Sequence, residues 1–483
     1  MIIRIIDRTI STAEAMSFKR ALLFIFSWIF IRIFFEGVLE VSGRIGFSSF
    51  SYRTLLTYFV HFPLFYLGLF FLLILVIAGL TGEHVRKVTK VCSLGLASIL
   101  LVPLIDWIVG HGFMITYPLR LGSYFINFLN PTVSLVAIGV SPGQRIVAFL
   151  VALLICFYGY AKWRNVFRAF GLFLLSLVII ILFGGLTTLV AGNRPESVFV
   201  TGGILYTDTQ KYCTIYILLF SVLSFAYICF FNREYFRVFI KTARIERIFF
   251  YGAMAVFGFG ISSIQAGRAL EVSFFNYVGI VTMFLSLAFG FWGLQVFNDF
   301  FDIDIDRIVD RNNPLLKGVT RDYYSTFGIF LMMMALCHAV IINFTAFLIL
   351  LTYLLLGIVY SLPPVRLKQI PVISTLILAV AVVLAIALGF SIHHGGRALN
   401  AIPAKILIPT VIAVTLGFIA KDIRHIEGDK AQGVITLPVL LYSPDTFTGR
   451  IPIAALVSAS YLVYAFFIPQ VLAGAVFFAS VTL

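Results

Sequence analysis

The chain has 483 residues, of which 61% are hydrophobic and only 12% are charged, and its mean hydropathy is +1.05. This composition excludes a soluble globular protein and predicts an all-α, polytopic bundle of transmembrane helices in a lipid bilayer. The net charge is +14, but the basic residues concentrate in short loops between apolar segments. That distribution signals membrane orientation and does not indicate a nucleic-acid partner.

Apolar segments of spanning length recur along the whole chain. At roughly twenty residues each, they predict about fourteen membrane spans. The first six begin near Ala21, Leu55, Val88, Arg145, Phe167 and Tyr212. The others begin near Ile248, Tyr277, Tyr323, Phe344, Pro371, Ala404, Ile451 and Gln470.

The first six spans form a predicted N-terminal membrane domain, residues 1–231. Arg32 and Glu36 are spaced i, i+4 in the first span and can pair, and Asp106 lies within the third span. We interpret these residues as charges at helix ends near the membrane interface; contacts to lipid headgroups or to a partner are the alternative. The pattern of spans is similar to that of the Yip family of multispanning membrane proteins. Scaffolding, substrate delivery and oligomerisation stay open as roles.

Residues 232–248, which read NREYFRVFIKTARIERI, mark the predicted boundary to a second domain, residues 232–483. The segment is basic and amphipathic, so it is suited to lie on an anionic membrane surface. An ordinary cytoplasmic linker that retains positive charge on the inner side explains the segment equally well. Its basic residues are Arg233, Arg237, Lys241, Arg244 and Arg247.

An acidic motif follows the second apolar segment of this second domain. It reads NDFFDIDID from Asn298 to Asp306. Carboxylates close to hydrocarbon are costly, so they are functional candidates by default. On a helix, Asn298, Asp302 and Asp306 share one face, with Asp299 at its edge.

A basic loop follows two spans later and reads YSLPPVRLK from Tyr360 to Lys368. Pro363 and Pro364 end the span and stiffen the turn. Arg366 and Lys368 are then placed to contact a diphosphate, the arginine bidentately and the lysine as a point charge. Taken alone, this loop is better explained by retention of positive charge on the cytoplasmic side.

A second acidic cluster follows the apolar segment that begins near Ala404. Asp422, His425 and Asp429 are spaced by 3 and then 4 residues, and they share a helix face. Two acidic faces can hold Mg²⁺ between them, because this ion prefers oxygen ligands and usually keeps water and substrate phosphate in its shell. Solvated acidic helix ends are the alternative, which the recurrence of two clusters on one predicted side disfavours.

Loop charge predicts the orientation of the chain in the membrane. If the N-terminus is cytoplasmic and the spans alternate, the cytoplasmic loops hold most of the Lys and Arg residues. Both acidic clusters and the basic loop between them then face the cytoplasm, so a single site can use all three. We therefore expect an integral multi-pass protein whose N-terminus and acidic motifs are cytoplasmic.

The three motifs, in this order, resemble those of the UbiA superfamily of intramembrane prenyltransferases. That family shows NDxxDxxxD, then a YSxPPxRxK-like loop, then a second acidic motif that runs into GxxTLPV. The third motif here comprises Lys421-Asp422, Glu427-Gly428-Asp429, Gly433 and Thr436-Leu437-Pro438. The resemblance covers residues 235–483, about half of the chain.

The resemblance implies a helical bundle around a central cavity with a lateral opening for an isoprenoid tail. The Mg²⁺ ligands that it implies are Asn298, Asp299, Asp302, Asp306, Asp422 and Asp429. The diphosphate contacts that it implies are Tyr360, Arg366, Lys368 and Lys421. Catalytic roles fall to Asp302, Asp306, His425 and Asp429. The metal and the cations would stabilise the departing diphosphate, and the acceptor would capture an allylic cation shielded from water.

The sequence therefore predicts a magnesium-dependent prenyltransferase with a polyprenyl diphosphate as donor. An aromatic quinone precursor is slightly favoured as acceptor on family frequency, and a lipid acceptor is open. His425 stands where relatives commonly have aspartate, which raises the alternative of a weakened homologue. A transporter or a cation- or lipid-binding protein without turnover is a further alternative; inverted repeats, which would support a transporter, are not apparent in the sequence.

Overall fold

The structure is a computed structural model of the chain. It describes residues 2–35, 51–110, 120–130, 139–191, 204–267, 273–308, 312–419, 423, 426, 430, 436–441, 450–463 and 465–466. These residues are nearly all helical, and none of them forms a strand. Ten helices in the described ranges are long and apolar enough to cross a membrane, judged by length and composition. The chain is thus an all-α, multi-pass membrane protein, as its composition predicts.

The chain divides into two compact units, and each is described by itself. The first unit comprises Met1–Thr201 and Tyr206–Arg233, and the second comprises Gly202–Leu205 and Glu234–Leu483. The boundary that the sequence predicts, between residues 231 and 232, lies close to this division.

The first unit contains five of the segments of spanning length. They are Tyr52–Thr81, Val85–Gly110, Pro142–Trp163, Val166–Gly184 and Asp208–Phe231. In order, they hold α3 (Tyr52–Leu55) and α4 (Phe62–Thr81), α5 (Val85–Gly95) and α6 (Leu101–Gly110), α8 (Pro142–Trp163), α9 (Val166–Gly184), and α12 (Asp208–Phe231). The remaining helices are α1 (Ile2–Ala15), α2 (Phe18–Phe35), α7 (Leu121–Leu129) and α10 (Leu186–Ala191). The predicted first span falls on α2, which carries Lys19, Arg20 and Arg32 and is not among the ten.

Two ionisable side chains of the first unit are buried. Arg32 on α2 is 2% exposed, and its guanidinium carbon lies 5.5 Å from the centre of the Tyr66 ring. Asp106 on α6 is fully buried, and its Oδ1 accepts a hydrogen bond of 2.7 Å from the N–H of Gly143 in the first turn of α8. Burial within the unit says nothing of depth in the membrane, so the interface interpretation stays a prediction for both. Glu36, the predicted partner of Arg32, lies outside the described residues.

Ion pairs attach the amphipathic helix α1 to the rest of the first unit. Lys162, near the end of α8, contacts Glu14 at 2.6 Å and Glu83 at 2.9 Å. Arg164, which follows α8, contacts Asp7 at 2.7 Å. These side chains are partly exposed, so each pair contributes about 0–1 kcal/mol. Their effect is to fix the place of α1 against α8 more than to stabilise the unit.

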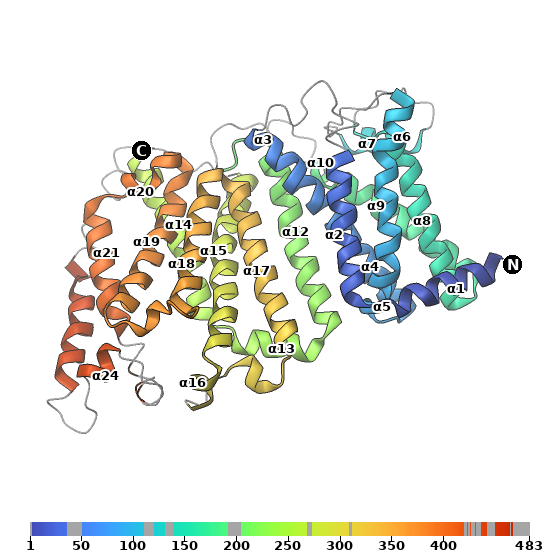
Figure 1. Ribbon diagram of the computed structural model, residues 1–483. Helices are drawn as coiled ribbons and strands as arrows, with labels where there is room; N and C mark the ends of the chain where they lie inside the picture. Colours follow the sequence, from blue (N-terminus) through green and yellow to red (C-terminus); the bar gives the residue numbers. More distant parts are fainter. Residues whose placement is uncertain are drawn as a thin grey trace. The chain divides into compact units, whose positions relative to one another are not determined.

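The second unit contains the other five segments of spanning length. They are α14 (Ile245–Gln265), α15 (Phe274–Phe301), α17 (Arg321–Ile342), α18 (Phe344–Ser361), and Ile373–Ala401, which holds α19 (Ile373–His394) and α20 (Ala398–Ala401). Its shorter helices include α13 (Arg233–Thr242), α16 (Ile303–Ile308), α21 (Ala404–Gly417) and α24 (Leu437–Leu441). In Figure 1, α13, α16 and α24 lie at the lower ends of the long helices, and α20 lies at the upper end.

The helices α14 and α19 approach each other closely at two glycines. A Cβ atom at Gly258 would stand 2.1 Å from the carbonyl oxygen of Ile386, and one at Gly389 would stand 2.1 Å from the carbonyl oxygen of Ala255. Because the obstructing atoms belong to backbone, no side-chain movement relieves the contact. Close contact through small residues is typical of helices that pack inside membranes.

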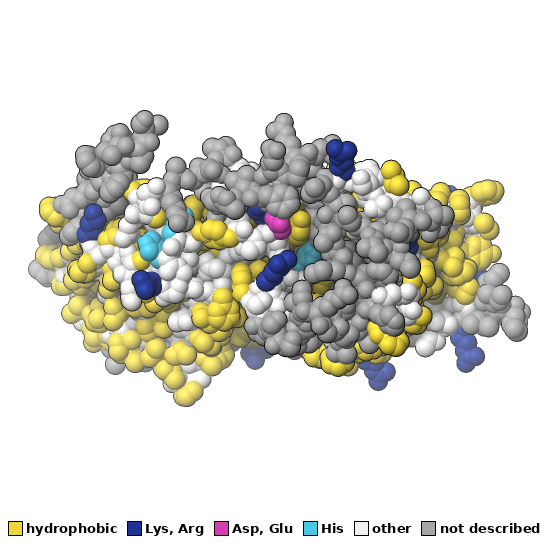
Figure 2. Space-filling model, turned by 90° about the horizontal axis from the view of Figure 1, so that it is seen from above, with side chains coloured by type: hydrophobic (Ala, Val, Ile, Leu, Met, Phe, Trp, Pro, Cys, Tyr) yellow, Lys and Arg dark blue, Asp and Glu magenta, His cyan; other side chains and the backbone are white. Residues whose placement is uncertain are grey.

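The upper end of the second unit is rich in imidazole and hydroxyl groups. His393 and His394, at the end of α19, hydrogen-bond Ser263 at 3.0 Å and Ser262 at 3.1 Å on α14. Figure 2 views the molecule from above, and on the described surface Lys, Arg and His side chains are visible while acidic side chains are scarce. The first acidic motif lies at the opposite end, where α15 meets α16 (Figure 1).

Candidate active site

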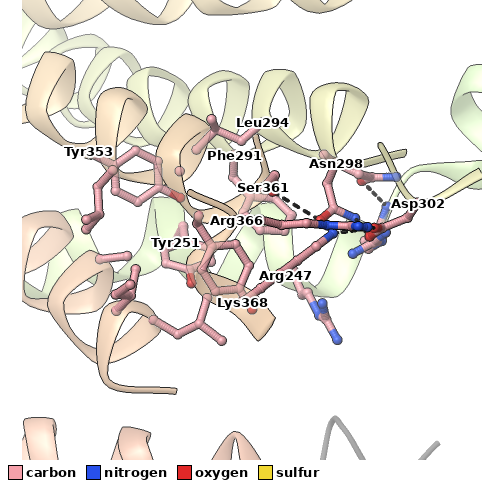
Figure 3. A pocket seen from close by; sticks show the side chains of 18 of the residues that line it. Arg247, Tyr251, Phe291, Leu294, Asn298, Asp302, Tyr353, Ser361, Arg366 and Lys368 are labelled. Carbon is pink, nitrogen blue, oxygen red and sulfur yellow. Dashed lines mark hydrogen bonds and ion pairs between the residues drawn. The ribbon is translucent and has the colours of Figure 1, made fainter. Parts of the chain in front are cut away.

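A pocket lies among α14, α15, α18 and α19 of the second unit, at the end where α15 meets α16. Its charged lining residues are Arg244, Arg247, Asp302, Asp306, Arg366 and Lys368. Its aromatic and aliphatic lining residues include Tyr251, Phe291, Leu294, Tyr353 and Ile377. Figure 3 shows the two kinds separated: polar side chains gather around Asp302, and Tyr251, Phe291 and Tyr353 lie toward the other end.

The first acidic motif spans the junction between α15 and α16. The N–H of Asp302 donates to the carbonyl of Asn298 at 3.1 Å, and the N–H of Asp306 donates to the carbonyl of Asp302 at 2.7 Å. Helical i, i+4 spacing is therefore kept across the junction. As a result, Asn298, Asp302 and Asp306 all line the pocket, on the shared face that their spacing predicts.

Arg366 and Lys368 meet this motif at Asp302. Arg366 Nη2 donates to Oδ1 of Asp302 at 2.9 Å, and Lys368 Nζ contacts the same oxygen. Asn298 Nδ2 donates to Oδ2 of Asp302 at 2.8 Å. Burial opposes ionisation of Asp302, but Lys368 and Arg366 outweigh it and hold the pKa of this carboxyl below its ordinary value of 3.8. Asp302 is therefore ionised at neutral pH.

The loop between α18 and α19 brings these cations to the pocket. Its Pro363–Pro364 peptide bond is cis, and Arg366 adopts a left-handed φ of +38°. That conformation costs a non-glycine residue roughly 1–2 kcal/mol. The N–H of Arg366 donates to the carbonyl of Leu362 at 2.9 Å, so the turn holds the residue in place. Tyr360, at the start of the same loop, also lines the pocket.

Asp299 lies in a different environment from the neighbouring carboxylates. It is 2% exposed and is not among the residues that line the pocket. Its Oδ1 accepts a hydrogen bond of 3.0 Å from Arg244 Nη2, and its Oδ2 accepts one of 2.8 Å from the Tyr324 hydroxyl. Asn313 Nδ2 donates to the carbonyl of Asp299 at 2.8 Å and to Oδ2 of Asp306 at 2.9 Å. The side chains of Arg244, Tyr324 and Asn313 thus hold the first acidic motif in place.

The second acidic motif falls mostly outside the described residues. This applies to four predicted site residues, Lys421, Asp422, His425 and Asp429, whose roles stay predictions. Thr436, further along the same motif, is described and lines the pocket. It is 4% exposed, and its Oγ1 has no hydrogen-bond partner within the described part of the chain.

Sequence reasoning missed several pocket residues. Arg244 and Arg247 were assigned to a linker, yet both line the pocket beside the first acidic motif. The signal that would have found them is their place at the start of a span, on the same predicted side as that motif. Gln295 also lines the pocket. It lies one helical turn before Asn298 on the motif's own face, so periodicity would have identified it.

The donor atoms of the pocket fit a hard divalent cation. Asp302 and Asp306 offer carboxylate oxygens and Asn298 offers an amide oxygen, which are the ligand types that Mg²⁺ prefers. The described residues hold no group of three or more His, Cys, Asp or Glu side chains able to bind a metal ion. The second acidic motif, which the sequence predicts to complete the ligand set, lies mostly outside those residues.

Comparison with known proteins connects this geometry to a family. Residues 249–483 match the model of the UbiA prenyltransferase family. A digeranylgeranylglyceryl phosphate synthase from Thermococcus sibiricus is 36% identical over 152 residues, which are 31% of this chain and 51% of that protein. A probable homogentisate phytyltransferase 2, chloroplastic, from Oryza sativa is 30% identical over 154 residues, or 30% of this chain and 40% of that protein. The chain thus spans about half the length of the curated relatives it matches.

Solved structures provide a second comparison. A UbiA homolog from Archaeoglobus fulgidus, bound to DMAPP and Mg²⁺, covers 51% of this chain and 84% of its own chain. Its sequence identity to this chain is 24%, and the TM-score is 0.38. The same homolog bound to GPP and Mg²⁺ gives 23% identity and the same TM-score of 0.38.

Proposed function

We propose that this chain, whose residues 249–483 belong to the UbiA prenyltransferase family, is a magnesium-dependent intramembrane prenyltransferase. It moves a polyprenyl group from its diphosphate to an acceptor. The observation that carries the proposal is the two-part pocket of the second unit. Carboxylates and cations gather at one end, and aromatic and aliphatic side chains form the other (Figure 3). A polyprenyl diphosphate has the same division between a charged head and an apolar tail.

The metal-binding proposal combines the two acidic motifs. Asn298, Asp302 and Asp306 supply oxygen ligands from the first motif, and Asp422 and Asp429 supply them from the second. When bound, Mg²⁺ neutralises negative charge that develops on the departing diphosphate. Each of these residues therefore acts on the leaving group rather than on the carbon that is transferred.

The cations of the basic loop bind the diphosphate. Arg366 and Lys368 lie at the charged end of the pocket, where their N–H groups can donate to phosphate oxygens, as those of Lys421 and the hydroxyl of Tyr360 are also predicted to do. Such hydrogen bonds strengthen as the C–O bond breaks, because negative charge then accumulates on the bridging oxygen. His425 keeps its predicted place as a further catalytic residue.

The aromatic end of the pocket suits the polyprenyl group. The rings of Tyr251 and Phe291 stack with their centroids 4.9 Å apart, and Tyr353 meets Tyr251 edge-on at 5.6 Å. Aromatic faces attract cations, so they stabilise positive charge on the allylic carbon. An apolar wall also keeps water from capturing that carbon before the acceptor does.

For the acceptor we favour a phosphate-bearing glycerol lipid over the aromatic acid that the sequence slightly favours. Arg244, which pairs with Asp299, and Arg247 line the pocket together with the two cations assigned to the diphosphate. Guanidinium groups bind phosphate well, so an acceptor that carries a phosphate suits this lining. The similarity to digeranylgeranylglyceryl phosphate synthases supports the same choice, and the similarity to a homogentisate phytyltransferase keeps the aromatic acceptor as the second candidate.

The arrangement in the membrane is also a proposal. The N-terminus and both acidic motifs face the cytoplasm, because that orientation puts most of the Lys and Arg residues inside. Residues 1–231 form a separate six-span membrane domain, and residues 232–483 form the prenyltransferase domain.

The function is tested with the purified full chain and geranylgeranyl diphosphate, by measuring diphosphate release. A geranylgeranylglyceryl phosphate, 4-hydroxybenzoate and a dihydroxynaphthoate serve as separate acceptors. We expect release with the glycerol phosphate lipid, abolished by EDTA. Asp302→Asn should lower turnover by at least about a hundredfold, since it removes a metal ligand and the partner of both cations.

The matched control is Asp304→Asn, which changes an exposed aspartate of the same motif that does not line the pocket. It should keep turnover. Full activity of Asp302→Asn would contradict the proposed site. Tight binding of the donor without release in the presence of any acceptor would instead favour a binding protein or a weakened homologue.

A further inference from the structure

The environment of Asp299 separates this residue from the ligands of its own motif. A metal ligand must present an oxygen to the space that the ion and the substrate share. Asp302 and Asp306 line that space, whereas Asp299 is not among the lining residues and is buried. Both of its oxygens accept strong hydrogen bonds, one from Arg244 and one from Tyr324.

Arg244, which donates the hydrogen bond to Asp299, lines the pocket. It is the N-cap residue of α14, and its carbonyl accepts hydrogen bonds from the N–H groups of Arg247 and Ile248 at 3.0 Å each. Two residues of α15 hold it as well. Gln295 Oε1 accepts from the N–H of Arg244 at 3.1 Å, and Gln295 Nε2 donates to the carbonyl of Thr242 at 3.0 Å. Asp299, one turn further along α15, binds the guanidinium.

Tyr324 on α17 fixes Asp299 in turn. The Tyr324 ring is 2% exposed and stacks on Phe239 of α13, with the centroids 5.4 Å apart, and on Phe300 of α15, at 5.8 Å. A tyrosine held by two rings has little freedom, so its hydroxyl donates from a fixed point. The carboxylate of Asp299 is thereby oriented toward Arg244.

We propose that Asp299 is a positioning residue, which holds the Arg244 guanidinium at the pocket wall to bind the phosphate of the acceptor, and that it is not a ligand of the metal. This inference rests on the proposed function for the identity of the acceptor. A guanidinium carries five N–H donors in a fixed fork, so it can contact a carboxylate and a phosphate at the same time. Because Asp299 already restricts the Arg244 side chain, this side chain loses less rotational entropy when it binds the phosphate.

The assignment differs from what the motif alone predicts, since the sequence includes Asp299 among the Mg²⁺ ligands. The two roles have different consequences for two separate equilibria. Loss of a ligand weakens metal binding. Loss of a positioning carboxylate weakens binding of the anion that Arg244 contacts and leaves the metal unaffected.

The test measures both equilibria on the full chain without relying on turnover. Mn²⁺ replaces Mg²⁺ and is followed by the EPR signal of the free ion, in the presence of geranylgeranyl thiolodiphosphate as an unreactive donor. Binding of geranylgeranylglyceryl phosphate is measured by calorimetry. We expect Asp299→Asn to keep the Mn²⁺ affinity within about twofold and to weaken the phosphate lipid by about tenfold, the range typical of lost supporting contacts.

Three further variants make the result specific. Asp302→Asn should weaken Mn²⁺ by at least about tenfold. Arg244→Ala should weaken the phosphate lipid as Asp299→Asn does, and the double variant should add little, because both changes remove one interaction. Tyr324→Phe, which removes only a hydroxyl, should give a smaller loss in the same direction and guards against misfolding of Asp299→Asn. The control Asp304→Asn should change neither affinity.

The outcomes distinguish the two roles. Mn²⁺ affinity that falls as far in Asp299→Asn as in Asp302→Asn overturns the inference, and so does a lipid affinity that Asp299→Asn leaves unchanged. Failure of the proposed function has a different signature: Mn²⁺ then binds wild-type protein and Asp302→Asn alike. The calorimetric arm still tests the contact between Asp299 and Arg244 in that case, since it requires no metal and no catalysis.

Discussion

At the scale of single residues, the candidate site depends on how each buried polar group is satisfied. Asp302 accepts hydrogen bonds from Arg366, Asn298 and Lys368. Such a carboxylate stays ionised at the edge of a membrane only because partners surround it. Thr436 is the exception in the same pocket. Its buried hydroxyl has no partner among the described residues, which costs about 1–3 kcal/mol if nothing in the complex satisfies it.

Thr436→Val replaces the hydroxyl with a methyl group of nearly the same shape, so it should keep or raise the thermal unfolding temperature of the free protein. If the hydroxyl bonds a substrate oxygen, the same change should lower kcat/KM by about tenfold, the equivalent of one hydrogen bond. Thermal unfolding and steady-state kinetics on one preparation measure both effects.

Thr415→Val is the matched control for that prediction. Thr415 on α21 also has a buried hydroxyl with no partner in the described ranges, but it does not line the pocket. It should show the same change in unfolding temperature with unaltered kinetics. Equal kinetics for Thr436→Val and wild type would remove Thr436 from the site.

At the scale of elements, the pocket is shaped by how closely its helices pack. The helices α14 and α19 both contribute to the pocket lining, and they meet through Gly258 and Gly389. Glycine has no Cβ atom, so the backbones of α14 and α19 lie directly against each other at these two positions. Tyr251, which lines the pocket, lies seven residues before Gly258 on the same helix.

Two glycines of α14 allow a matched prediction. Gly258→Ala would place Cβ 2.1 Å from the carbonyl oxygen of Ile386, whereas Gly260→Ala meets no atom within 4 Å. The first substitution should destabilise the protein by about 1–3 kcal/mol through overpacking. The second should be neutral or stabilising by up to about 1 kcal/mol, because alanine favours helix over glycine. The two stabilities are compared by thermal unfolding in detergent. Equal unfolding temperatures for the two variants would contradict the close packing of α14 on α19.

At the scale of the whole molecule, the distribution of charge sets the orientation that we propose. The first unit carries exposed Lys87 in the first turn of α5, and the second carries exposed Lys317 between α16 and α17. Exposed Arg397 lies beyond α19, at the end of the second unit opposite the pocket (Figure 1). The positive-inside rule assigns the first two positions to the cytoplasm and the third to the outside.

Labelling of introduced cysteines tests this orientation. In a background without the native cysteines, Lys87→Cys and Lys317→Cys should react with a membrane-impermeant maleimide in inside-out vesicles only. Arg397→Cys should react in right-side-out vesicles only. Opposite labelling of Lys87→Cys and Lys317→Cys would mean that an odd number of spans separates them. The even number of spans predicted between residues 87 and 317 would then be wrong.

The sequence by itself determined the class of the molecule and the composition of its site. Apolar segments of sufficient length admit only helices in a bilayer, since every backbone polar group must be paired there. The i, i+4 spacing of Asn298, Asp302 and Asp306 required a common face, and all three line one pocket. The fold class is confirmed and residues 249–483 match the UbiA prenyltransferase family, whereas the site residues of the second acidic motif stay predictions.

Only the tertiary structure decided which faces meet. Helical periodicity orders residues around one axis, but it carries no information about the neighbour that each face contacts. For this reason the sequence grouped Asp299 with the metal ligands, while the structure pairs it with Tyr324 and Arg244 and leaves it out of the pocket lining. Arg244 belongs to the pocket rather than to a linker because α15, distant in sequence, holds the junction before α14. Asp106 is buried at the start of α8 for the same reason: its partner is 37 residues away, and only folding brings the two together.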